Sequence, residues 1–109
     1  DSIFLPTHHP DANPSWFAFL MTVKDESRFT KTELVAHLEN AKIQTRSYFT
    51  GNALLHPAYK KLREGYEDVQ AAFPIATKVT NDSFFLGVWP GAKDEHFDYI
   101  EKVVEEFMS

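Results

Sequence analysis

Residues 81–91 read Asn-Asp-Ser-Phe-Phe-Leu-Gly-Val-Trp-Pro-Gly, and this stretch decides the fold. A short aromatic and apolar run that stops at a Pro-Gly pair is typical of a buried strand followed by a turn. We therefore predict a strand over residues 84–89. The acidic pair Asp94-Glu95 that follows predicts the positive end of a last helix. The buried stripe of that helix would consist of Phe97, Ile100, Val104 and Phe107.

Two apolar runs upstream predict the other strands of the sheet. Residues 16–23 lie between Pro14 and a charged segment, and residues 43–49 are followed by the breaker Thr50-Gly51-Asn52. Between them, Thr30 and Glu33 have the spacing of a capping box, in which each side chain hydrogen-bonds the backbone N–H of the other residue. This box predicts the start of a helix whose buried face would carry Leu34, Val35, Leu38 and Ala41.

The segment between the last two strands is less regular. His56-Pro57 predicts a short helical turn through Leu62, residues 65–72 predict a loop or a weak helix, and Pro74 suits the first turn of another helix. At the other end of the chain, residues 1–14 contain three prolines and predict an extended lead-in segment.

These elements predict a small two-layer α+β domain over residues 15–109. We expect a three-stranded, mainly antiparallel sheet with helices on one face. The first two strands could instead pair in parallel across the helix that joins them, and the sequence leaves both pairings open.

Composition excludes several classes of function. The 109 residues form one domain, and the net charge of -5 argues against binding of nucleic acid, which needs a basic surface. Without Cys the chain has no disulfide, thiolate metal site or Cys nucleophile, which fits a cytoplasmic protein. No apolar stretch is long enough to predict a membrane span, and the N-terminus shows no signal-peptide pattern.

The histidines favour structural roles over chemistry. His8-His9 is a possible metal pair, but neighbouring side chains of an extended chain point to opposite sides, and only Asp11 lies at ligand spacing. A solvated loop is therefore the favoured interpretation there. We expect His37 and His96 on helix surfaces. His56 lies on a loop, where functional residues concentrate, yet a structural role is still favoured.

Arg46 is the most informative charged residue, because it lies in the otherwise uncharged stretch 43–55. A lone guanidinium on a strand either pairs with a carboxylate of the fold or binds an anionic ligand, and the residues favour neither. The aromatic residues could form a stacking surface for bases, but the acidic balance favours a core role for most of them. These are Trp16, Phe17, Phe19, Phe84, Phe85 and Trp89.

Four motifs occur in a fixed order: Pro14-Ser15-Trp16-Phe17, Lys42-Ile43-Gln44-Thr45-Arg46, Phe49-Thr50-Gly51-Asn52 with His56-Pro57, and residues 81–91. Together they resemble the C-terminal domain of the DegT/DnrJ/EryC1/StrS group of sugar-modifying, pyridoxal-phosphate-type enzymes. The Phe-x-Gly-Asn and Asn-x-x-Phe-x-x-Gly-x-x-Pro-Gly elements are most similar to the 3-dehydratase branch that acts on CDP-4-keto-6-deoxy-D-glucose. The resemblance covers nearly the whole chain.

The resemblance implies a parent enzyme with the fold of aspartate aminotransferase. A large domain upstream of Asp1 would bind pyridoxal or pyridoxamine phosphate (PLP/PMP), this domain would complete the cleft, and the fragment alone would bind no cofactor. The substrate would be a nucleotide-linked 4-keto-6-deoxyhexose of lipopolysaccharide biosynthesis. An upstream base, His in dehydratases and Lys in aminotransferases, would remove a proton, and in a dehydratase the C3 hydroxyl would then be expelled. The parent would be a homodimer, and a dehydratase would also use an iron–sulfur cluster and a reductase partner.

The resemblance also implies site residues, none of them catalytic or metal-binding. Arg46 matches the basic residue of the Gly-x-x-Thr-Arg element and would face the sugar nucleotide. The adjoining loop would approach the sugar and the cofactor with Phe49, Gly51 and Asn52. Lys78 stands where the dehydratases have Arg, which binds phosphate in a bidentate manner that Lys cannot reproduce. Lys42 replaces the Gly usual at a helix end that favours the left-handed region.

We therefore expect an inactive C-terminal domain, with the reacting groups upstream of Asp1 and a complete C-terminus. Three alternatives stay open: a sugar-nucleotide aminotransferase of the same group, a stand-alone ferredoxin-like module that binds a metabolite, and a dimerisation domain.

Overall fold

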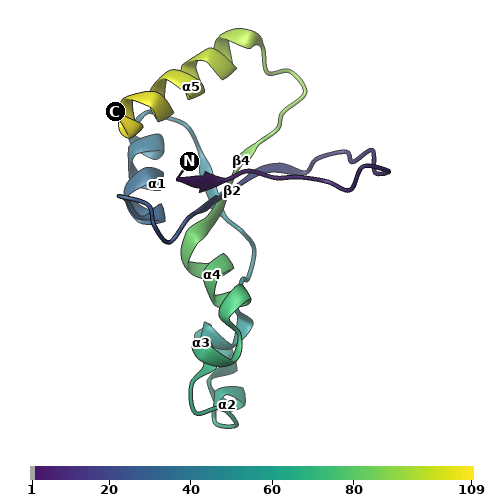
Figure 1. Cartoon of the computed structure of the whole chain (residues 1–109), viewed down its shortest axis with the longest axis vertical. Coiled ribbons are helices and arrows are strands. Elements are labelled where there is room, and N and C mark those ends of the chain that lie inside the picture. The colour runs from purple at the N-terminus through teal and green to yellow at the C-terminus, as the bar shows by residue number, and fades with distance from the viewer. Residues whose placement is uncertain (1) are drawn as a thin grey trace.

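The computed structural model describes residues 2–109, and Asp1 lies outside the described residues. Its centre is a four-stranded sheet in the order β1-β2-β4-β3 (Figure 1). The strands are β1 (Ile3–Phe4), β2 (Ala18–Val23), β3 (Thr45–Ser47) and β4 (Ser83–Gly87). All three neighbouring pairs are antiparallel. The small α+β domain and its antiparallel sheet are thus confirmed.

The predicted number of three strands is wrong, because Ile3 and Phe4 in the lead-in segment pair with Val23 and Thr22 at the edge of the sheet. Two residues are too few to show a period of two, so this edge strand leaves no pattern in the sequence. The parallel alternative is also wrong. β2 and β3 do not pair with each other, since β4 lies between them.

Two helices, α1 (Lys31–Asn40) and α5 (Asp94–Met108), cover one face of the sheet (Figure 1). The strand residues on that face and the inner residues of the helices make one apolar core. It consists of Met21, Val23, Leu34, Leu38, Ile43, Phe84, Leu86 and Val103.

The predicted stripe of α5 needs one correction. Ile100, Val104 and Phe107 pack against the core, and Val103 is the most buried residue of the helix. Phe97, however, is 56% exposed. The reason is that α5 meets α1 with its C-terminal half, while its first turns project past the covered part of the sheet (Figure 1).

The ends of α1 follow the sequence closely. The Thr30 hydroxyl accepts a hydrogen bond from the Glu33 backbone N–H at 3.3 Å, and the Thr30 N–H donates to Glu33 Oε2 at 2.7 Å. The helix ends at Asn40 with Ala41 as its C-cap, and the next residue, Lys42, has a φ of 65°. The N–H of Ile43 then donates to the Leu38 carbonyl at 2.9 Å, which closes the helix end.

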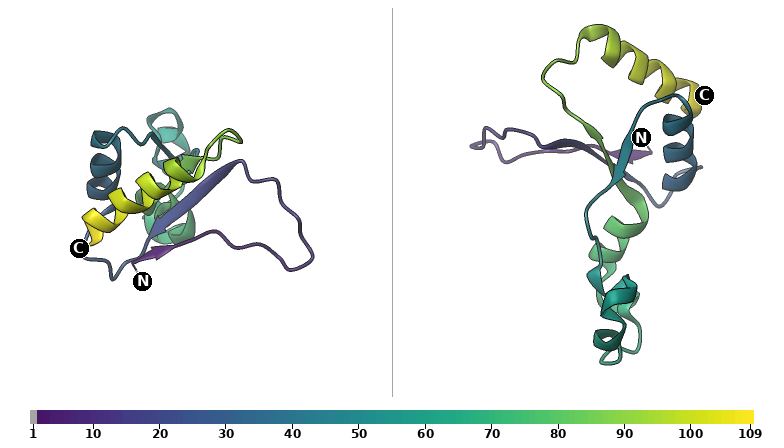
Figure 2. Two further views of the ribbon diagram at one scale, coloured as in Figure 1. Left: turned by 90° about the horizontal axis from the view of Figure 1, so that it is seen from above. Right: turned by 180° about the vertical axis from the view of Figure 1, so that it is seen from behind.

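Residues 53–73 form a column of short turns that projects from the sheet and returns through α4 (Pro74–Asp82) (Figure 2). Its elements are η1 (Ala53–Leu55), η2 (Pro57–Tyr59), α2 (Lys60–Arg63) and α3 (Val69–Ala72). The predicted turn after His56 and the helix that begins at Pro74 are both present. None of the helices in residues 2–109 is long and apolar enough to cross a membrane.

Candidate functional site

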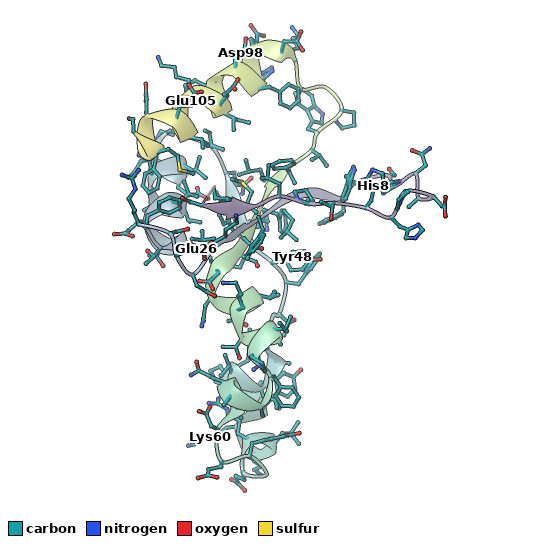
Figure 3. The ribbon with its side chains drawn as sticks, in the orientation of Figure 1. His8, Glu26, Tyr48, Lys60, Asp98 and Glu105 are labelled. Carbon is teal, nitrogen blue, oxygen red and sulfur yellow. The ribbon has the colours of Figure 1, made fainter. Side chains whose placement is uncertain are left out.

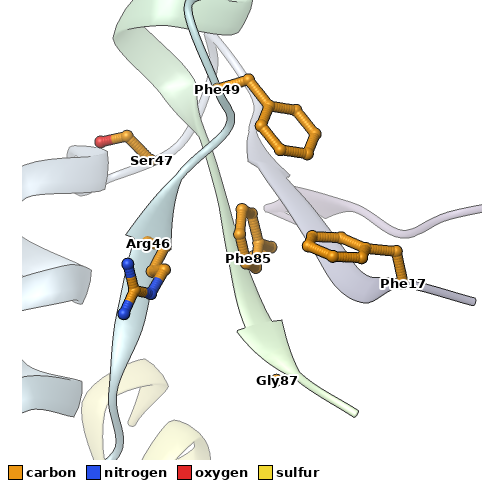
Figure 4. A pocket seen from close by; sticks show the side chains of 6 residues that line it. All are labelled: Phe17, Arg46, Ser47, Phe49, Phe85 and Gly87. Carbon is orange, nitrogen blue, oxygen red and sulfur yellow. The ribbon is translucent and has the colours of Figure 1, made fainter.

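The candidate site is a hollow on the face of the sheet that α1 and α5 leave open. Side chains alternate along a strand, so Phe84 and Leu86 point to the helices while Phe85 and Gly87 point the other way. Arg46 is the register partner of Phe85 and shares its face. The hollow has a volume of about 620 Å³ and is lined by Phe17, Arg46, Ser47, Phe49, Phe85 and Gly87 (Figure 4).

Three aromatic rings form one side of the hollow. The ring centroid of Phe17 lies 5.8 Å from that of Phe49 and 5.9 Å from that of Phe85, and Phe49 and Phe85 are 6.0 Å apart. These spacings are typical of mutual aromatic contact. Phe85 is 9% exposed, whereas Phe17 and Phe49 are 73% and 66% exposed. The hollow therefore presents two largely open rings beside a buried one.

The expected core role of the aromatic residues is correct for Phe84 and Phe85 only. Exposed instead are Trp16, Phe17, Phe19 and Trp89. An apolar run predicts a strand, but it does not say whether the same chain supplies a cover for both faces. Here the helices cover one face, and Phe17 lines the hollow on the other. Phe19 is the register partner of Leu86 and shares the helix side with it, but it is not among the residues of the core.

Arg46 is the cation of the hollow (Figure 4). It is exposed on β3. The ion pairs found within residues 2–109 involve His9, Lys78, Lys93 and Lys102, and Arg46 takes part in none of them. The sequence left two roles open for Arg46, an ion pair with a carboxylate of the fold or a contact with an anionic ligand. The ion pair is not observed within residues 2–109.

Gly51 and Asn52 lie against α4 and do not line the hollow. The Asn52 N–H donates to Thr80 Oγ1 at 2.7 Å, and its side-chain amide donates to Thr77 Oγ1 at 3.1 Å. Asn52 is 3% exposed. Gly51 has a φ of 57°, and a Cβ there would come within 2.2 Å of Thr80 Oγ1. Both residues hold the loop in place instead of facing open space.

Lys78 also lies away from the hollow. Its Nζ forms ion pairs with Asp25 and, at 3.1 Å, with Asp82, and it donates to the Val23 carbonyl at 3.3 Å. The hydrogen bond to Asp25 is the main reason why the pKa of Lys78 is raised. The structure therefore brings Arg46 and Phe49 together, but it does not bring Lys78 to them.

The histidines have protein partners. His56 Nε2 lies 2.8 Å from the Thr50 carbonyl, and His37 Nε2 lies 3.0 Å from the Val103 carbonyl. His96 Nδ1 accepts from the Lys93 N–H at 2.9 Å at the start of α5. In the described part of the chain, no three His, Cys, Asp or Glu side chains gather closely enough to hold a metal ion.

The lysines do not fit attachment of a pyridoxal-type cofactor, which needs an amine directed into a cleft. Lys24 lies over the Phe4 ring at 4.9 Å, and Lys31 donates to the Thr80 carbonyl at 2.8 Å. Burial lowers the pKa of Lys31, but its amine is directed at the end of α4. Together with Lys78 these are the half-buried lysines of residues 2–109, and the amine of each one already has a partner in the fold.

Sequence reasoning missed four lining residues: Phe17, Ser47, Phe85 and Gly87. Phe85 and Arg46 share a face because β3 and β4 pair in one particular register, and no motif reveals that register. Gly87 leaves space because, apart from its two chain neighbours, no atom of residues 2–109 lies within 4 Å of where its Cβ would be.

Comparison with known proteins shows which sequences this chain resembles. The model of the DegT/DnrJ/EryC1/StrS aminotransferase family matches residues 1–105. The chain is 36% identical over 107 residues to dTDP-4-dehydro-2,6-dideoxy-D-glucose 3-dehydratase of Saccharopolyspora spinosa, covering 98% of the chain and 22% of that protein. It is 36% identical over 103 residues to the lipopolysaccharide biosynthesis protein RfbH of Salmonella typhimurium, covering 94% of the chain and 23% of that protein. The chain thus spans less than a quarter of the length of these relatives.

Two solved structures share the fold. Both are of GDP-4-keto-6-deoxymannose-3-dehydratase, one a variant with bound GDP-perosamine and the other with a trapped PLP-glutamate geminal diamine. Their TM-scores are 0.68 and 0.67 at 23% sequence identity, and the match covers 92% of this chain and 25% of theirs. At this identity the likeness concerns the fold alone.

Proposed function

Because the chain belongs to the DegT/DnrJ/EryC1/StrS aminotransferase family, we propose that it completes the substrate cleft of a PLP/PMP-dependent nucleotide-sugar enzyme. The reaction that we propose is removal of the C3 hydroxyl from a 4-keto-6-deoxy sugar. The relatives support this reaction, since a curated relative and a protein of the same fold both carry the name 3-dehydratase.

The observation that carries the proposal is an exposed guanidinium that lines the same hollow as three aromatic rings. A nucleotide sugar combines a diphosphate with flat, partly apolar rings. Arg46 would bind a phosphate oxygen through charge-assisted hydrogen bonds, while Phe17 and Phe49 would contact a ring of the ligand. Gly51, Asn52 and Lys78 would act indirectly, by holding the loop and α4 where they are.

The nucleotide is a finer part of the proposal. The motifs favour a CDP-linked sugar, whereas the names of the relatives contain dTDP and GDP. Binding assays with the CDP, dTDP and GDP forms of one 4-keto-6-deoxy sugar would rank them, and we expect the CDP form to bind most tightly.

The remaining parts of the proposal concern the whole protein. An upstream domain would bind the cofactor and supply the base, and two copies would form a homodimer in the cytoplasm. An iron–sulfur cluster and a reductase partner would complete the deoxygenation. These parts rest on family membership, because the hollow contains no group that could do this chemistry.

The test is Arg46→Ala in the full-length protein that contains this chain. Loss of a charge-assisted phosphate contact is expected to cost about 2 kcal/mol, or roughly 30-fold in substrate affinity. Lys61→Ala is the matched control, because it removes the same charge from the projecting column. Unchanged affinity of the Arg46 variant, measured by calorimetry, would remove Arg46 from the site.

The alternatives need other measurements. An aminotransferase would transfer an amino group from glutamate to the keto sugar, whereas a dehydratase would release water without forming an amino sugar. A stand-alone module would bind a nucleotide sugar without any upstream domain. Trp16 and Trp89 are both exposed, so their fluorescence can report such binding in this chain.

A further inference from the structure

The loop after β3 holds Phe49 in an unusual backbone conformation. Phe49 has a φ of 47° and Gly51 a φ of 57°. Glycine adopts this left-handed region freely, but a phenylalanine does so at a cost in free energy. The Phe49 N–H donates to the Ser47 carbonyl at 2.8 Å, and its ring contacts Phe17 and Phe85. The residues that follow it, Gly51 and Asn52, are held from the side of the loop that faces α4.

The main contact of Gly51 and Asn52 is the hydroxyl of Thr80, two residues before the end of α4. Its oxygen accepts a hydrogen bond from the Asn52 N–H at 2.7 Å and donates to the Ala76 carbonyl at 3.1 Å. The donated bond fixes the orientation of the hydroxyl, so that a lone pair points to the loop. The backbone of Gly51 lies so close to Thr80 that no side chain would fit between them.

Two further bonds restrain the same loop. Thr77 Oγ1 accepts from the Asn52 side-chain amide at 3.1 Å. His56 lies 2.8 Å from the carbonyl of Thr50. With residues 50–52 held in this way, the Phe49 ring is the part of the loop that projects into the hollow (Figure 4).

We propose that Thr80 is a positioning residue for the hollow. Its hydroxyl fixes the Gly51–Asn52 backbone on α4, which keeps Phe49 left-handed and its ring against Phe17 and Phe85. The consequence for substrate affinity rests on the proposed function, but the link between Thr80 and the Phe49 ring does not.

The first test uses this chain and no ligand. Thr80→Val keeps the shape of the side chain but removes the hydroxyl, whereas Thr80→Ser keeps the hydroxyl. In NMR experiments we expect the Val variant to lose at least tenfold in hydrogen-exchange protection of the Asn52 amide and to lose the nuclear Overhauser contacts between Phe49 and Phe17. The Ser variant should keep both. Thr22→Val, which removes the hydroxyl bonded to Ser83 at 2.8 Å, controls for the general loss of a partly buried hydroxyl.

Retention of the Phe49 contacts in Thr80→Val would overturn the proposal. If that variant unfolds, the unmodified chain still decides, because its Asn52 amide must exchange as slowly as the amides of β4. Exchange at the rate of an unprotected amide would overturn the proposal equally.

The second test separates this inference from the proposed function. In the full-length protein we expect Thr80→Val to raise the KM for the nucleotide sugar about three- to tenfold, with a smaller effect on kcat, and Thr80→Ser to restore KM. If Arg46→Ala has no effect, the proposed function fails, and the NMR result still decides the role of Thr80. If Arg46→Ala weakens binding while Thr80→Val changes neither KM nor the Phe49 ring, the inference about Thr80 fails.

Discussion

At the scale of single residues, Lys42 shows how this chain departs from an ideal sequence for its fold. It follows the C-cap of α1 in the left-handed region, with a φ of 65°, at the position where glycine is preferred. The sequence motif indicated a glycine-type position, and the structure confirms its conformation.

We expect Lys42→Gly to stabilise the chain by about 1 kcal/mol, since the Cβ that disfavours this conformation is removed. Urea unfolding followed by circular dichroism measures the change. Lys102→Gly is the matched control inside α5, where the same replacement should destabilise the chain by about 1 kcal/mol. A less stable Lys42→Gly variant would mean that a contact of the Lys42 side chain stabilises the fold by more than the left-handed backbone destabilises it.

At the scale of elements, Glu39 joins α1 to β3. Its Oε1 accepts hydrogen bonds from the Thr45 hydroxyl at 2.7 Å and from the Thr45 N–H at 2.6 Å. These bonds stabilise the charged carboxylate, the hydroxyl bond contributing most, and they lower the pKa of Glu39. A group with a lowered pKa in the folded state stabilises the fold above its unfolded pKa, about 4.3 for Glu. That stabilisation is lost as the pH falls through the folded pKa.

We therefore expect Thr45→Val to raise the pKa of Glu39 towards its ordinary value, and to weaken the dependence of stability on pH below about pH 4. Carboxyl chemical shifts across a pH titration measure the first effect, and urea midpoints measure the second. Glu33 is the internal control, because its pKa is lowered by Thr30 at the other end of α1. A Glu39 pKa that stays low in the variant would contradict the role of the hydroxyl.

The elements that the sequence predicted are those with local signals. The capping box at Thr30 located the start of α1 within one residue, and Pro74 located the start of α4. β1 has no such signal, because its existence depends on pairing with the distant end of β2. The predicted burial of Phe97 was wrong for a similar reason, because helical periodicity does not show where α5 extends beyond the sheet.

The candidate site also combines residues that a local signal marks with residues that only long-range pairing brings together. Arg46 and Phe49 could be selected because a lone charge and a motif mark them in the sequence. Phe17 and Phe85 join them only through the register of three strands. Thr80 could not be found at all, since its role depends on a close approach between a loop and a helix that lie 28 positions apart.

At the scale of the whole molecule, the chain is more extended than a domain that folds around one core. The radius of gyration of its Cα atoms is 16.1 Å, and its extents are 50 × 35 × 25 Å. A compact domain of this length would have a radius of about 13 Å. Two projections account for the difference: the lead-in arm that carries His8 and the column that carries Lys60 (Figure 3).

We expect small-angle X-ray scattering of the dilute chain to give a radius of gyration close to the 16.1 Å of the structure. This radius should not change on further dilution. The physical reason is that neither projection adds residues to the central core, so little apolar burial draws them inward. Removal of residues 1–15 provides a control, because it removes the arm together with the edge strand β1 and should leave the column unchanged. A measured radius as small as that of a compact domain would contradict the open form. It would imply that a projection folds over the exposed rings of Phe17 and Phe49, and Arg46 would then be covered by the chain itself before any ligand arrives.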